Sequence, residues 1–128
     1  MTGGASPARR GIAFERDTRR ALEHAGYFVV RAAGSHGPAD LVALRRDHVP
    51  YLVSCKLDGY LTPDERLGLL ETAFIAGGWP ILAAKEKRGR VSLYALHGNG
   101  KQPMYELPIP KRANHARESE TVDGARTQ

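Results

Sequence analysis

Two charged residues, Asp40 and Lys56, adjoin short hydrophobic runs, and side chains of these types can take part in cleaving a phosphodiester. Asp40 leads into the run at residues 41–44, and Lys56 closes the run at residues 51–55. Neighbouring strands would bring the carboxylate and the ammonium together. With Glu15 upstream on a predicted helix, these residues are typical of a metal-dependent phosphodiesterase that acts on nucleic acid.

Phosphodiester hydrolysis needs an activated water, neutralised phosphate oxygens and help for the departing alkoxide, and a divalent cation serves all three needs. Mg²⁺ and Mn²⁺ prefer carboxylate, carbonyl and water oxygens, which makes Asp40 a candidate ligand. Two alternatives stay open: Asp40 could cap its Gly- and Pro-rich turn, and Lys56 could simply reach solvent. Because strand residues alternate, Ser54 and Lys56 should share a face, while Cys55 points the other way as a small apolar residue.

Local patterns predict the elements that position these residues. An apolar stripe predicts a helix that starts near Gly11 and ends at Gly26, with Glu15 at the stripe's edge; its members are Phe14, Thr18, Ala21, Leu22 and Ala25. Apolar and β-branched runs predict strands at residues 27–30, 40–44, 51–55, 79–84 and 91–96. The second and third of these do not alternate cleanly, which predicts central strands buried on both faces.

A second helix is predicted after Thr62, which forms a capping box with Glu65, and Gly77-Gly78 should end it. Leu67, Leu70 and Phe74 form its predicted apolar stripe. The element order αβββαββ predicts an α/β fold with a central mixed sheet flanked by helices.

Composition favours a single globular domain with a nucleic-acid partner. The 128 residues are 41% hydrophobic and carry a formal charge of +5, which favours a polyanion. We expect a flexible arm at residues 1–10, the domain at 11–98, and a polar tail at 99–128 with a short ordered segment near 103–109. No apolar run is long enough to cross a bilayer, and a lone cysteine is consistent with a reducing compartment. These features predict a cytoplasmic protein without membrane contact or a small-molecule cofactor.

Four segments resemble the archaeal-type Holliday-junction resolvases, with relatives in phages and bacteria, within the PD-(D/E)XK nuclease superfamily. They are residues 11–15, the turn Arg31-Ala32-Ala33-Gly34-Ser35, Pro38-Ala39-Asp40, and Ser54-Cys55-Lys56. The resemblance covers about residues 11–96. It implies a restriction-endonuclease-like fold and a homodimer that cuts four-way junctions by Mg²⁺-dependent paired nicking, with Mn²⁺ as a substitute. We would then expect the protein to act in the cytoplasm of a bacterial or phage-infected bacterial cell.

Carried over by position, Glu15 and Asp40 resemble the family's metal ligands, Lys56 its catalytic lysine and Ser35 its active-site serine. The departure is Ser54, where the family pattern usually has Glu and sometimes Gln. Ser54 could bind the metal itself or through water, another acid could substitute, or the protein could be a weak nuclease. Glu71 is a candidate substitute, because a helical wheel places it inside the apolar face of the second helix.

Nucleic-acid contacts are expected from arginines near Glu15 and from two further side chains. The arginines are Arg9, Arg10, Arg16, Arg19 and Arg31, and the other two residues are His36 and Tyr60. Apolar residues around Leu69, Ala73 and Ala76 exceed what one helix stripe needs and weakly favour a dimer. Two other functions stay open: a different PD-(D/E)XK DNA endonuclease of restriction or repair type, and a weakly active or inactive branched-DNA-binding protein.

Overall fold

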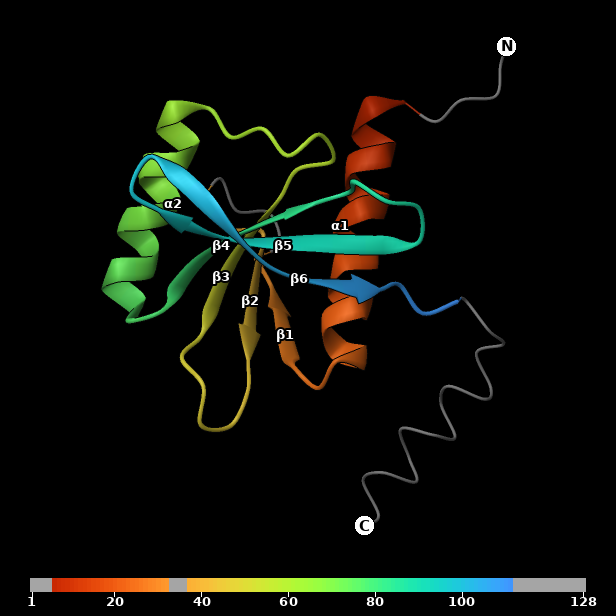
Figure 1. Cartoon of the computed structure of the whole chain (residues 1–128), viewed down its shortest axis with the longest axis horizontal. Helices are drawn as coiled ribbons and strands as arrows, with labels where there is room; N and C mark the ends of the chain where they lie inside the picture. Colours follow the sequence, from red (N-terminus) through yellow and green to blue (C-terminus); the bar gives the residue numbers. More distant parts are fainter. Residues whose placement is uncertain (1–5, 33–36, 112–128) are drawn as a thin grey trace.

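A six-stranded sheet forms the centre of the computed structural model, which describes residues 6–32 and 37–111. The element order is α1 (Pro7–His24), β1 (Phe28–Arg31), β2 (Leu41–Leu44), β3 (Tyr51–Cys55), α2 (Pro63–Ala76), β4 (Trp79–Ala84), β5 (Arg90–His97) and β6 (Gly100–Pro108). Figure 1 shows α1 and α2 on opposite sides of the sheet. The α/β class with a mixed sheet is confirmed, with one strand more than predicted.

The strands lie side by side in chain order, and only one neighbouring pair is parallel. β1, β2 and β3 form an antiparallel meander, and β4, β5 and β6 form a second one. β3 and β4 join the two halves in parallel, with Val53 opposite Ile81. A parallel pair needs a crossover connection, and α2 is that connection. β3 is buried along most of its length, as predicted for a central strand, whereas β2 is buried only at alternate positions.

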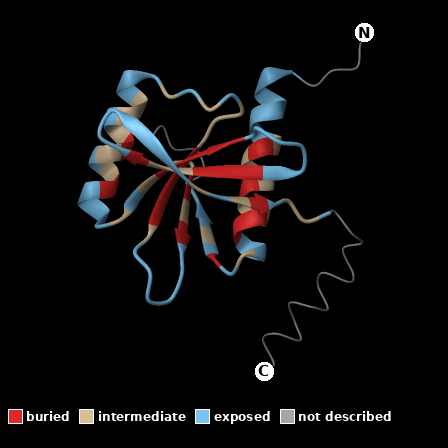
Figure 2. Cartoon of the chain, viewed as in Figure 1, coloured by how far each residue is buried: buried red, intermediate tan, exposed pale blue. Residues whose placement is uncertain are grey.

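α1 packs on one face of the sheet and begins earlier than predicted. The predicted stripe is buried at Phe14, Thr18, Ala21 and Leu22. The helix starts at Pro7, inside the stretch expected to be a flexible arm, because the Ser6 side chain accepts a hydrogen bond from the Arg9 backbone and Pro7 occupies the first turn. Together with the sheet, α1 encloses the larger part of the core (Figure 2).

α2 covers the other face of the sheet, and its ends are where the sequence predicts them. Thr62 and Glu65 form the capping box, and Gly77 ends the helix with a left-handed φ of 67°. The predicted apolar stripe is wrong, because the buried residues are Leu69 and Ala73, which pack against β3 and β4, while Leu67 and Phe74 are exposed. Leu69 and Ala73 therefore belong to the chain's own core and are not free for a dimer.

The end of the domain also differs from the prediction. β6 pairs with β5 from Gly100 to Pro108, so regular structure continues through much of the expected tail. The side chain of Leu107, on this strand, is buried, and the Tyr105 hydroxyl lies 3.1 Å from the Tyr27 hydroxyl. Neither helix in the described part of the chain is long and apolar enough to cross a membrane.

Candidate functional site

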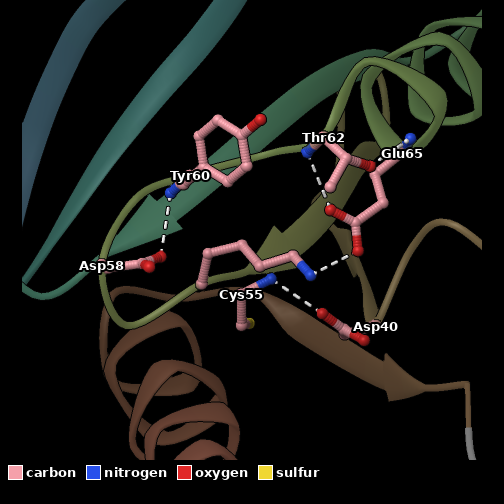
Figure 3. A network of polar contacts seen from close by, with 7 residues as sticks. Asp40, Cys55, Asp58, Tyr60, Thr62 and Glu65 are labelled. Atoms are coloured by element: carbon pink, nitrogen blue, oxygen red, sulfur yellow. Dashed lines mark hydrogen bonds and ion pairs between the residues drawn. The ribbon is translucent and has the colours of Figure 1, made fainter.

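Asp40 is fixed by backbone contacts between the start of β2 and the end of β3. Its own N–H donates to the Val53 carbonyl at 2.8 Å, and its Oδ2 accepts from the Cys55 N–H at 2.7 Å (Figure 3). Burial raises the pKa of the carboxyl above its ordinary value, although the Cys55 N–H opposes the shift, and Glu15 and Glu65 raise it further by charge repulsion. Acids whose pKa is shifted in this way are common at functional sites.

Ser54 and Lys56 line the same hollow as Asp40, as strand alternation predicts. Ser54 is almost fully buried, with 3% of its surface exposed. Cys55 points to the other face, where it packs against the core beneath α1, and burial raises the pKa of its thiol. Cys55 is therefore not a nucleophile of this site.

Glu65 is the acid that sequence reasoning left out of the site. Its Oε2 lies 2.6 Å from Nζ of Lys56, and its Oε1 accepts from the Thr62 N–H at 2.9 Å. The contact with Lys56 is the main cause that lowers the pKa of the Glu65 carboxyl. In the sequence Glu65 is explained by the capping box alone, so its second contact becomes visible only once α2 is docked beside β3.

Glu15 lines a neighbouring hollow between α1 and β1. Its Oε2 accepts a 2.7 Å hydrogen bond from Nε of Arg31, and Arg16 and Arg19 border the same space. The structure thus groups Asp40, Ser54 and Lys56 in one hollow and places Glu15 in the adjoining one, still near enough for its charge to act on Asp40.

Glu71 lies among apolar residues of α2, as the helical wheel indicates, but this face of the helix is exposed and does not pack against the sheet. The side chain is exposed on α2 and borders an apolar hollow formed with Leu70, Phe74 and Ile75. The residues around the Asp40 hollow do not include it. The buried face of α2 is centred on Leu69 and Ala73 instead.

The other predicted contacts lie around these hollows or outside the described residues. Ser35 and His36 fall in the segment 33–36, which the structure does not describe. Arg9 and Arg10 are exposed in the first turns of α1, and Tyr60 is 61% exposed in the loop before α2.

The donor set of the Asp40 hollow fits a hard divalent cation. The hollow has a volume of about 340 Å³, and its described lining residues supply carboxylates, the Ser54 hydroxyl and the Lys56 ammonium, with no sulfur or imidazole among them. One or two carboxylates with several waters is a usual environment for Mg²⁺, and a water needs about 30 Å³, so a hydrated cation fits the space. Across residues 6–32 and 37–111, no three His, Cys, Asp or Glu side chains are grouped closely enough to bind a metal by themselves. The described acids that line this hollow are Asp40, Asp64 and Glu65.

Comparisons with known proteins find a matching family model, a similar sequence and a similar fold. Residues 6–107 match the family model described as archaeal Holliday junction resolvase (Hjc). The chain is 38% identical over 107 residues to the crossover junction endodeoxyribonuclease Hjc of Methanocaldococcus jannaschii, with 79% of each chain covered. It is also similar to the solved structure of Hjc, a Holliday junction resolvase of Archaeoglobus fulgidus, with a TM-score of 0.60 and 25% identity over 73% of this chain and 87% of the other. The segment matched by the family model contains every residue of the Asp40 hollow.

Proposed function

The chain belongs to the archaeal Holliday junction resolvase family, a family of metal-dependent nucleases that act on four-way DNA junctions, and we propose that Asp40 and Lys56 are central to its endonuclease site. The observation that carries this proposal is the placement of both side chains in one hollow at the ends of β2 and β3. The backbone N–H of Cys55 fixes one carboxylate oxygen there, so the acid is held before any substrate arrives.

The residues divide into ligands and groups that act on the phosphate. Asp40 is a ligand for the cation, Glu15 supports it from the adjoining hollow, and the buried Ser54 hydroxyl can contact a coordinated water. When bound, Mg²⁺, or Mn²⁺ in its place, activates a water and neutralises the phosphate oxygens. Lys56 presents its ammonium to the same space, where it orients the attacking water or stabilises the charge of the transition state. Ser35 completes the proposed catalytic set.

The arginines of α1 and β1 are proposed to hold DNA phosphates beside the catalytic hollow. Arg16, Arg19 and Arg31 border the hollow that contains Glu15; Nε of Arg31 is paired with Glu15 and Nε of Arg19 lies 4.0 Å from Oε2 of Glu23. Guanidinium groups bind phosphate through paired donors. Arg9, Arg10, Tyr60 and His36, the last of which lies outside the described residues, are proposed as further DNA contacts. Because the hollow bordered by these arginines adjoins the Asp40 hollow, a DNA backbone could run from the arginines into the catalytic hollow.

We propose that a homodimer with two such sites resolves the junction by paired nicking. The support is an apolar face of α2 that the chain itself leaves open, since Phe74 is 87% exposed and Ile75 is 84% exposed. These two residues and Leu70 form an apolar hollow on that face. Exposed apolar surface of this kind marks interaction sites. Sedimentation should show a dimer for the native chain and a monomer for Phe74→Glu, while Phe28→Glu on β1 should remain dimeric.

Cleavage of a synthetic four-way junction tests the activity. The native chain should cut the junction with Mg²⁺ or Mn²⁺, leave a linear duplex of the same arm sequences intact, and stop when the cations are chelated. Asp40→Asn should cut at least about a hundredfold more slowly, which is the size of effect that one electrostatic catalytic group has, while junction binding persists. Cleavage by Asp40→Asn at the native rate would remove Asp40 from the mechanism.

The similar proteins described above come from archaea. They give no support to the bacterial or phage origin that the resemblance alone had allowed.

A further inference from the structure

In the Asp40 hollow, position 54 is a serine and supplies no carboxylate, but Glu65 lines the same hollow and does supply one. Ser54 is neutral, buried and two residues before Lys56 on the same face of β3. With only Asp40 and Lys56, the centre of the hollow would carry one negative and one positive charge. Such a pair is neutral and attracts a cation poorly. Glu65 and Asp64 add negative charge to the hollow, and of these two acids Glu65 is the one found in contact with Lys56 among the described residues.

The carboxylate of Glu65 is held in place from both sides. Its Oε1 accepts from the Thr62 N–H at 2.9 Å, and the Glu65 N–H donates to Thr62 Oγ1 at 3.1 Å. Its Oε2 lies 2.6 Å from Nζ of Lys56. A capping box uses only one carboxylate oxygen and requires no contact with the sheet. The second oxygen is therefore directed into the catalytic hollow by the same hydrogen bond that starts the helix.

Asp40 offers a matching oxygen across the hollow. Its Oδ2 accepts a hydrogen bond from the Cys55 N–H, which leaves the Oδ1 atom to coordinate a cation. Asp40 and Glu65 line the same hollow, and Figure 3 shows the Asp40 carboxylate beside the Cys55 nitrogen and the Glu65 carboxylate reaching down from α2. Asp64 also borders this space, but no contact with Lys56 is found for it among the described residues. Glu71 borders a different hollow.

We propose that Glu65 supplies the carboxylate that Ser54 lacks, holding the ammonium of Lys56 and forming with Asp40 the oxygen pair for the divalent cation. The inference rests on the proposed function, because it concerns the cation of the same nuclease site. It predicts that an acid is dispensable at position 65 if one is restored at position 54.

The test is Mn²⁺ binding by the full-length protein, measured by isothermal titration calorimetry without DNA. Glu65→Gln should weaken Mn²⁺ binding at least about tenfold, the lower end of the effect of altering groups around a metal site. The double variant Ser54→Glu/Glu65→Gln should return to within about threefold of the native affinity. Asp64→Asn removes a neighbouring charge from the same helix turn and should change the affinity less than about threefold.

Thr62→Ala separates this role from helix capping. It breaks the other half of the capping box and keeps the charge of Glu65, so it should lower the melting temperature and preserve Mn²⁺ affinity. Equal Mn²⁺ affinity of the native chain and Glu65→Gln would overturn the inference, and so would a double variant that binds no more tightly than Glu65→Gln.

Asp40→Asn distinguishes failure of this inference from failure of the proposed function. If Asp40→Asn loses Mn²⁺ binding and junction cleavage while Glu65→Gln keeps both, only the role of Glu65 is refuted. If Asp40→Asn also keeps both, the hollow is not the catalytic centre, and the proposed function and the inference fail together.

Discussion

Asp40 should affect folding and catalysis in opposite directions, and two substitutions separate these effects. Its Oδ2 is the acceptor for the Cys55 N–H at 2.7 Å in a partly buried position. Asp40→Ala leaves that N–H without its acceptor, which costs about 1–3 kcal/mol in the free energy of unfolding. Asp40→Asn keeps an oxygen acceptor and removes the charge that burial penalises. It should be at least as stable as the native chain at pH 7, while both variants lose cleavage.

The dependence on pH follows from the raised pKa of Asp40. Since the folded state binds this proton more tightly than the unfolded state, the native chain gains stability relative to Asp40→Asn as the pH falls through the folded pKa. The gain is complete below the ordinary Asp pKa of 3.8, where the carboxyl is protonated in both states. Above the folded pKa the native chain carries the full penalty of the buried charge.

Urea unfolding of the three proteins, followed by circular dichroism at pH 7 and near pH 4, measures both effects. The difference between the native chain and Asp40→Asn isolates this carboxyl, because the other titrating groups are common to both proteins. Two results would refute the reasoning: an Asp40→Asn variant as unstable as Asp40→Ala, or an advantage of Asp40→Asn that grows as the pH is lowered.

Three other substitutions or reagents probe the packing, the thiol and the DNA surface. Gly78→Ala should lower the free energy of unfolding by about 1–3 kcal/mol, because its β-carbon would collide with the backbone oxygen of Pro50; Gly11→Ala, with open space around it, should not destabilise the fold in the same urea titration. Iodoacetamide should label Cys55 slowly in the folded protein and quickly in urea, since burial raises the pKa of the thiol, and rapid labelling of the folded protein, seen by mass spectrometry, would contradict its placement. Arg16→Ala should weaken junction binding and lower the slope of log affinity against log salt by about one, and an unchanged slope would remove Arg16 from the DNA surface.

Signals contained within a few residues predicted the structure well. The start of α2 at Thr62, the burial of Ser54 on a central strand and the placement of Lys56 beside Asp40 all follow from local chemistry and from the two-residue repeat of a strand. The start of α1 was missed although its signal is equally local. Ser6 and Pro7 form a helix start, but neighbouring glycines gave that stretch the composition of a flexible arm.

The face that α2 buries could not be predicted from periodicity. The apolar residues of this helix are spread around most of its circumference, so its sequence has no single apolar stripe. Contact with β3 and β4 determines that Leu69 and Ala73 are the buried residues. Gly68 marks the close approach, because a β-carbon there would lie 3.3 Å from the Pro38 side chain. A helix turned to this face presents Glu71 and Phe74 outward, which explains why Glu71 is not among the residues that line the Asp40 hollow.

The position of Glu65 follows from the topology of the sheet. β3 and β4 are parallel neighbours, so the chain must leave the end of β3, cross over through α2 and return to the start of β4. The connection from Cys55 to Pro63 is short, which keeps the first turn of α2 close to the end of β3. In this structure the acid at the third position of the helix lies beside the lysine that closes β3. The contact between Glu65 and Lys56 therefore depends on how α2 docks against β3, which the capping box alone does not determine.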